Sequence, residues 1–153
     1  MTEQGRGGSI INVVSDAFHI GLVGLGPYGT AKGGIYGFMR GLSAEFAPLG
    51  VSVNAVAPPM TRTPPVEEFL ASREATGAPA EELEFYRATI QQPDEVATIT
   101  VALATERGRT LHGQVFTMTR DSLALLRPNA TKSVAADGPW TIDSLAAAAT
   151  SFG

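Results

Sequence analysis

The amino-acid sequence predicts an α/β fold with about three parallel strands joined by crossover helices. Three short apolar, β-branched runs predict buried strands at residues 9–14, 51–56 and 114–118. Between the first two runs, apolar residues recur at three- and four-residue steps, which predicts a helix over residues 28–46. A strand, a helix and a strand over this distance form a βαβ unit, so we expect parallel strands with a right-handed crossover.

Glycine, proline and acidic residues predict where the other elements begin and end. Glycines break any periodicity in residues 15–26, which we expect to be a loop, and Pro48 and Gly50 end the long helix. Residues 66–86 predict two short helices around Gly77 and Pro79. Another helix is expected from residue 93 to about 106, because acidic side chains in its first turn favour a helix start.

The end of the chain predicts a short strand and a last helix. The strand is expected at 123–126 and the helix at about 142–151. Trp140 precedes this helix and is expected to pack it against the rest of the domain.

Composition excludes several classes of function. The net charge is −4 and no basic cluster is visible, which argues against nucleic-acid binding. The chain has no Cys, which excludes disulfides, thiolate metal sites and Cys nucleophiles, and His19 and His112 are too far apart in sequence to indicate a metal site. No apolar run could span a membrane, and the polar, Gly-rich start is unlike a signal peptide, so we expect a cytoplasmic protein.

Tyr28 and Lys32 are the strongest chemical signal in the sequence. They are four residues apart, so a helix places them on the same face. A phenol can give or take a proton at a substrate oxygen, and the positive charge of a neighbouring lysine favours the phenolate form. An exposed helix face with a stacked Tyr and Lys is the alternative interpretation of the spacing.

Other candidate residues lie where ligands bind in parallel sheets. Ligand sites in open α/β sheets lie outside the carboxyl ends of the strands. Ser15 and Thr61 come just after two predicted strand ends, and Tyr28 begins the helix at the same edge. No His or Cys is placed to activate Ser15 as a nucleophile. A group of apolar residues is expected either to cover an apolar ligand or to pack ordinarily: Phe69, Leu70, Leu83, Phe85 and Tyr86.

Glycines inside the long helix require an explanation, because each costs up to ~1 kcal/mol relative to Ala. They lie at positions 33, 34, 37 and 41. Small residues on one side of a helix let another backbone approach closely. A helix from a second subunit is one candidate for that backbone, so we expect a homo-oligomer that forms through residues 28–46.

The motifs together resemble the short-chain dehydrogenases/reductases. The strand that leads to Ser15, the Tyr28-x-x-x-Lys32 pair thirteen residues later and the run at 53–58 match the family's second half in order and spacing. The loop at 58–64 resembles the family's loop over the nicotinamide, and the segments at 93–96 and 111–114 resemble its last helix and strand. The tail segment 138–141 resembles the extension of some members related to hydroxyacyl-CoA dehydrogenases.

The resemblance implies NAD(P)-dependent interconversion of a carbonyl and an alcohol on a small molecule, either hydroxyacyl-CoA-like or another apolar substrate. Tyr28 would be the acid/base, Lys32 would bind the nicotinamide ribose, and Ser15 would hold the substrate oxygen. The residues implied to contact NAD or NADP are Tyr28, Lys32, Pro58, Met60, Thr61 and Thr63. Val14 stands where many members have Ser, and Pro59 stands where the family usually has Gly.

The resemblance also predicts the domain organisation. No Gly-rich phosphate-binding fingerprint occurs in the sequence, so residues 1–121 are expected to be the C-terminal half of a doubly wound, Rossmann-type domain whose N-terminal nucleotide-binding half is absent. Residues 122–153 would be a C-terminal extension. As a fragment the chain is expected to be inactive alone and to bind NAD(P) weakly or not at all.

Two other functions remain open at this point. The chain could be a non-catalytic remnant or subunit of the family that dimerises with a complete partner. It could also be a small module that binds an apolar ligand under the segment from Phe69 to Tyr86.

Overall fold

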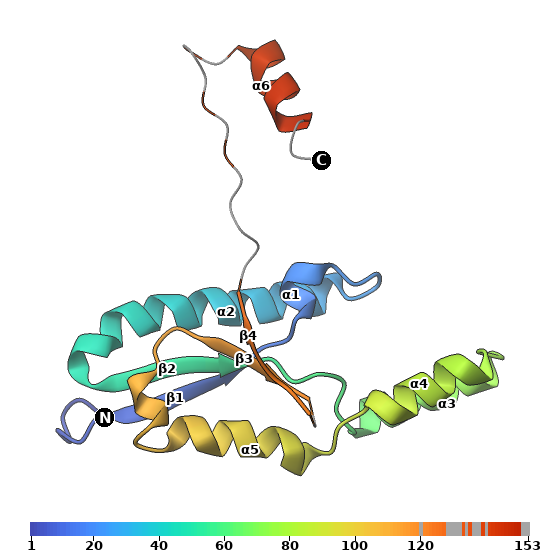
Figure 1. Cartoon of the computed structure of the whole chain (residues 1–153), viewed down its shortest axis with the longest axis horizontal. Helices are drawn as coiled ribbons and strands as arrows, with labels where there is room; N and C mark the ends of the chain where they lie inside the picture. Colours follow the sequence, from blue (N-terminus) through green and yellow to red (C-terminus); the bar gives the residue numbers. More distant parts are fainter. Residues whose placement is uncertain (120, 128–132, 134, 136–138, 140, 151–153) are drawn as a thin grey trace.

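A four-stranded sheet forms the centre of the chain (Figure 1). The computed structural model describes residues 1–119, 121–127, 133, 135, 139 and 141–150. The strands follow the order β1 (Gly8–Val13), β2 (Val51–Val56), β3 (Val115–Met118) and β4 (Leu123–Leu126). The first three are parallel, as predicted, and β4 pairs antiparallel with β3.

Helices occupy most of the remaining described residues. The α-helices are α1 (Ala17–Ile20), α2 (Gly26–Phe46), α3 (Pro64–Ala75), α4 (Ala80–Thr89), α5 (Pro93–Ala104) and α6 (Ile142–Thr150). Two short 3₁₀ helices follow α2 and α5, at Ala47–Leu49 (η1) and Gly108–Thr110 (η2).

Two differences from the prediction lie between β1 and Tyr28, and both have local reasons. Helix α2 begins two residues before Tyr28, because Pro27 has a backbone angle suited to a first turn and needs no hydrogen-bond partner there. The prediction of an uninterrupted loop at 15–26 is wrong, because α1 forms one turn at its start. The Asp16 carbonyl accepts the amides of His19 and Ile20, at 2.9 and 3.2 Å, and Gly21 ends the turn with φ +68°.

Helices cover both faces of the sheet, with α2 on one face and α5 on the other (Figure 1). Alternate residues of β2 point to opposite faces. Val53 and Ala55 pack with Met39 of α2, whereas Val56 packs with Ile99 of α5. All six residues of β2 are buried, so this strand connects the two hydrophobic layers.

Asn54 is a fully buried polar residue in this strand, at 0% exposure. Its side-chain amide donates to the Leu111 carbonyl at 2.7 Å, and its side-chain oxygen accepts the Gln114 amide at 3.1 Å. Burial without these partners would be costly. Asn54 therefore holds the segment that leads into β3 against β2.

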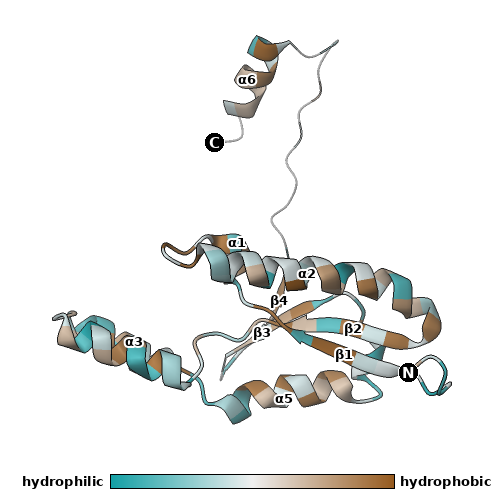
Figure 2. Cartoon of the chain, turned by 180° about the vertical axis from the view of Figure 1, so that it is seen from behind, coloured by the Kyte–Doolittle hydropathy of each residue, from teal (hydrophilic) through white to brown (hydrophobic). Residues whose placement is uncertain are grey.

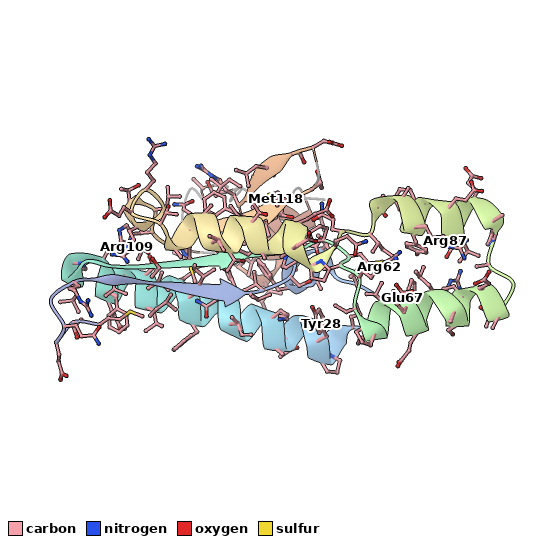
Figure 3. All side chains as sticks on the ribbon, turned by 90° about the horizontal axis from the view of Figure 1, so that it is seen from below. Tyr28, Arg62, Glu67, Arg87, Arg109 and Met118 are labelled. Atoms are coloured by element: carbon pink, nitrogen blue, oxygen red, sulfur yellow. The ribbon has the colours of Figure 1, made fainter. Side chains whose placement is uncertain are left out.

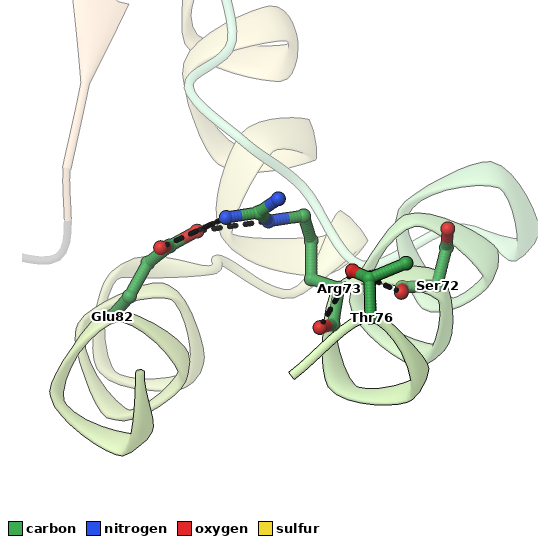
Figure 4. A network of polar contacts seen from close by, with 4 residues as sticks. All are labelled: Ser72, Arg73, Thr76 and Glu82. Carbon is green, nitrogen blue, oxygen red and sulfur yellow. Dashed lines mark hydrogen bonds and ion pairs between the residues drawn. The ribbon is translucent and has the colours of Figure 1, made fainter. Parts of the chain in front are cut away.

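The hairpin formed by α3 and α4 extends away from the sheet (Figure 1). Leu70 and Leu83 are the buried apolar residues of its two helices. Arg73 joins the two helices through three hydrogen bonds of 2.8–3.0 Å to both carboxylate oxygens of Glu82 (Figure 4). The Thr76 hydroxyl donates to the Ser72 carbonyl at 2.9 Å and ends α3 (Figure 4).

Both ends of the hairpin meet at one short bridge. The Gln91 amide donates to the Met60 carbonyl at 3.0 Å, and the Arg62 amide donates to the Gln91 carbonyl at 2.8 Å. These two bonds form a parallel bridge between Thr61 and Gln91. The hairpin is therefore closed at its base.

Figure 1 shows the last described helix, α6, apart from the sheet. The predicted packing role of Trp140 lies outside the described residues. The predicted boundary between 121 and 122 stays a prediction, although β4, which follows it, belongs to the same sheet as β3. No helix in the described part of the chain is long and apolar enough to cross a membrane.

The Asn54 hydrogen bonds predict a stability difference between two asparagines. Asn54→Ala leaves the Leu111 carbonyl and the Gln114 amide without their partner, so we expect the free energy of unfolding to fall by about 3 kcal/mol. Asn12→Ala is the control, because that side chain makes one 3.4 Å bond and should cost less than about 1 kcal/mol. Urea denaturation measures both, and equal losses would contradict this role.

Candidate active site

A cavity of about 670 Å³ opens at the carboxyl ends of β1 and β2. Its size is typical of sites for small molecules and cofactors. Its walls come from the end of β1, the start of α2, the loop after β2 and the starts of α3 and α5. The lining residues are Val13, Val14, Ser15, Asp16, Leu22, Leu25, Tyr28, Lys32, Pro58, Pro59, Met60, Thr61, Thr63, Pro65, Val66, Phe69, Pro93 and Val96.

All seven candidate site residues from the sequence line this cavity. They are Ser15, Tyr28, Lys32, Pro58, Met60, Thr61 and Thr63. Residues far apart in sequence meet here because parallel strands end at the same sheet edge.

Tyr28 lies in the first turn of α2 and its side chain is half-exposed (Figure 3). Lys32, one turn later, has its ammonium nitrogen 5.6 Å from the centroid of the Tyr28 ring. The same nitrogen donates to the Val13 carbonyl at 3.0 Å. This bond connects α2 to the end of β1 and holds the positive charge beside the phenol.

Ser15 follows β1 and is buried. Its hydroxyl oxygen accepts the Ala17 amide at 3.3 Å, and its proton is donated to the Asp16 carboxylate over a long 3.4 Å contact. The backbone amide thus uses one side of the oxygen. A ligand oxygen in the cavity that offers a shorter hydrogen bond could accept the Ser15 proton in place of the Asp16 carboxylate.

The loop after β2 forms the opposite side of the cavity. Pro58 and Pro59 have no amide hydrogen to donate. The Thr61 hydroxyl donates to the Pro59 carbonyl at 2.8 Å, which stabilises the loop that carries Met60. Arg62 forms a 3.2 Å ion pair with Glu67 of α3 (Figure 3). Both side chains are about half-exposed, so the pair stabilises the loop by no more than about 1 kcal/mol.

Among the five residues expected to cover an apolar ligand, the structure brings only Phe69 into the cavity lining. Leu70 and Leu83 are buried residues of the hairpin, and Phe85 is 64% exposed. The ring of Tyr86 packs edge-on against Phe69, with 5.3 Å between the ring centroids. Ordinary packing therefore accounts for most of this group.

Four residues of interest that line the cavity were not among the candidates predicted from the sequence. Asp16, Leu22 and Leu25 lie in the segment that was expected to be a plain loop, and Val96 lies in α5. An apolar Gly-Leu-Val-Gly-Leu segment beside a candidate serine is a signal that could have identified the two leucines. His19 and His112 do not line the cavity. In the part of the chain that the structure describes, no three His, Cys, Asp or Glu residues are grouped to hold a metal ion.

Comparison with known proteins identifies the family. A family model described as enoyl-(acyl carrier protein) reductase matches residues 1–119. The chain belongs to the short-chain dehydrogenase/reductase family. The predicted α/β architecture and the family resemblance are both confirmed.

Similar proteins include a curated enzyme and two solved structures. The chain is 34% identical over 119 residues to the (2S)-[(R)-hydroxy(phenyl)methyl]succinyl-CoA dehydrogenase subunit BbsD of Thauera aromatica, covering 73% of this chain and 43% of that protein. A short-chain dehydrogenase from Mycobacterium avium superposes with a TM-score of 0.67 at 26% identity, covering 94% of this chain and 44% of the other. A variant of actinorhodin polyketide ketoreductase with NADPH superposes with a TM-score of 0.66 at 29% identity. The match covers 78% of this chain and 48% of the ketoreductase.

The chain spans less than half of the length of these relatives. Its cavity fits one part of a nicotinamide dinucleotide. Tyr28 and Lys32 offer donors to ribose hydroxyls, and the valines and prolines offer apolar surface to a flat ring. Lys32 is the cation that lines the cavity, and it is already bonded to Val13. The described lining thus suits the nicotinamide and its ribose rather than the pyrophosphate.

Proposed function

We propose that this chain carries the catalytic part of an NAD(P)-dependent oxidoreductase that interconverts a carbonyl and an alcohol. One observation carries the proposal: a single cavity contains Ser15, Tyr28, Lys32 and the loop residues that the family resemblance assigns to the cofactor. The chain's membership of the short-chain dehydrogenase/reductase family supports the same reaction class.

When bound, NAD or NADP would supply or accept the hydride at the substrate carbon. Tyr28 gives the proton to the carbonyl oxygen during reduction and takes it back during alcohol oxidation. The Lys32 ammonium stabilises the phenolate that remains. Its bond to the Val13 carbonyl and its contact with the Tyr28 ring support this role. Ser15 donates its hydroxyl to the same substrate oxygen in place of the contact to Asp16.

The cofactor would contact the chain through Tyr28, Lys32 and the loop after β2. Pro58 and Met60 would contribute contact surface, and Thr61 and Thr63 would contact the carboxamide. The proposal covers NAD and NADP alike, because the residues that we assign to the cofactor would contact its nicotinamide end, which the two share. The apolar lining supports a small apolar carbonyl or alcohol substrate, with a hydroxyacyl thioester as one candidate class.

A second candidate function is supported by the outer face of α2. Phe38 is 61% exposed on this helix, and a Cβ added at Gly34, Gly37 or Gly41 would meet no atom within 4 Å. An exposed aromatic ring among glycines suits close packing of a second helix. The chain could then act as a subunit that pairs through α2 with another copy or with a complete family member.

The acid/base role predicts a difference between two tyrosines of α2. In an enzyme completed with the N-terminal half of a related dehydrogenase, Tyr28→Phe should lower kcat at least about 100-fold, because the proton donor is lost. Tyr36→Phe is the control, because Tyr36 stacks on Phe18 at 4.6 Å and does not line the cavity. Steady-state ketone reduction measures both, and full activity of the Tyr28→Phe enzyme would exclude the role.

The cofactor assignment predicts how the chain itself binds nicotinamide compounds. Because we assign the described lining to the nicotinamide end of the cofactor, NADH, NADPH and reduced nicotinamide mononucleotide should bind weakly and with affinities within about threefold of one another. Nicotinamide fluorescence titrations measure the three affinities. Binding of NADH or NADPH more than tenfold tighter than the mononucleotide would show that the chain also holds the pyrophosphate or adenosine.

The pairing of α2 predicts an oligomer that depends on Phe38. Phe38→Ser should shift the chain toward monomer, whereas Val101→Ser should not, because Val101 is equally exposed but lies on α5. Sedimentation velocity at several concentrations compares the two variants with the unchanged chain. A monomer before substitution, or equal dissociation of both variants, would refute pairing through this face.

A further inference from the structure

The turn between α1 and α2 presents leucines to the cavity. The Leu25 amide donates to the Leu22 carbonyl at 3.1 Å, which closes a four-residue turn. Gly24 has φ +80° at the third position, a conformation that glycine adopts without strain. Leu22 and Leu25 both line the cavity, although they are 44% and 41% exposed, whereas Val23 at the tip is fully exposed (Figure 2 shows the apolar turn beside α1 in brown).

The first turns of α3 form a second apolar wall. Pro65, Val66 and Phe69 line the same cavity as the two leucines. The rings of Phe69 and Tyr86 of α4 pack nearly perpendicular to each other, which restricts where the Phe69 ring can lie. Apolar side chains that remain this exposed on two separate elements of one cavity indicate a binding surface.

Charge around the cavity indicates what kind of molecule fits. Among the lining residues that the structure describes, the charged ones are Asp16 and Lys32. The Lys32 ammonium is engaged by the Val13 carbonyl and the Tyr28 ring. The Asp16 carboxylate stands beside the Ser15 hydroxyl, so an anionic group next to the reacting carbon would meet a like charge there.

We propose that Leu22 and Leu25 on one side and Phe69 on the other form a subsite for an apolar substituent, and that Asp16 discriminates against a carboxylate beside the reacting carbonyl. The preferred substrates are then uncharged ketones or secondary alcohols with an aryl or alkyl substituent. This proposal rests on the proposed function for the position of the reacting carbonyl, and it adds the residues that determine specificity.

Titration of the full chain with three ketones, in the absence of cofactor, tests the proposal. Binding is followed through the NMR signals of the Leu and Val methyl groups of the chain. The probe is 4-phenyl-2-butanone. 2-Butanone lacks the phenyl group, and 2-oxo-4-phenylbutanoate replaces the ketone's methyl by a carboxylate. We expect the probe to bind at least about tenfold tighter than 2-butanone. We expect the probe to bind about fivefold tighter than the oxoacid, because the carboxylate of the oxoacid is repelled by the Asp16 carboxylate near the protein surface.

Matched variants assign the effects to residues. Leu22→Ser and Phe69→Ala should each weaken binding of the probe about tenfold. Val23→Ser and Phe85→Ala replace residues outside the lining and should not change its binding. Phe69→Leu should restore part of the affinity, which shows that the loss at this position is not misfolding. Asp16→Asn should reduce the difference in affinity between the probe and the oxoacid, because it removes the negative charge.

Equal effects of the lining and control variants, or equal binding of all three ketones, would overturn the subsite. The proposed function is judged separately, by NADPH-dependent reduction of the probe in the completed enzyme. If the probe binds with the expected variant pattern but is not reduced, the proposed function fails and the subsite stands. If it is reduced without any dependence on Leu22 or Phe69, the subsite fails and the function stands.

Discussion

Burial of β2 on both faces is the constraint on which the rest of the structure depends. Each of its six residues is buried, and alternate side chains belong to the layers under α2 and α5. A strand of this kind needs a helix on either side, and each buried Val contributes about 1.5 kcal/mol or more. The helices must then start or end at the sheet edges, which brings α2, α3 and α5 to one cavity.

The cavity shows how a helix and a strand end are fixed relative to each other. Lys32 reaches back from the second turn of α2 to the Val13 carbonyl. Val14 continues the ladder beyond β1, since its amide donates to the Val56 carbonyl at 2.8 Å. Ser15 therefore leaves the sheet from a rigid position, while Tyr28 is set by the helix. A site built on element ends in this way keeps its geometry better than one built on a free loop.

Much of the architecture could be predicted because its signals are local. Apolar β-branched runs and the Tyr28–Lys32 spacing depend only on neighbouring residues, and the rule for parallel strand ends then places Ser15 and Thr61 together. The single turn α1 could not be predicted, since two backbone bonds to the Asp16 carbonyl form it without a periodic pattern. The role of each aromatic residue in the hairpin depends on helix-to-helix packing, which sequence spacing alone does not determine. The functional roles of the site residues stay predictions.

The closed base of the α3–α4 hairpin has a consequence for how this domain can change. Two backbone hydrogen bonds join the loop after β2 to Gln91, so the hairpin between them begins and ends at the same place in the fold. Lengthening a loop between fixed ends costs little entropy, about 0.6 kcal/mol per doubling. A hairpin of another length or sequence could be grafted at this point without moving the sheet. The cavity wall that α3 contributes could thus change in sequence while Ser15, Tyr28 and Lys32 keep their positions.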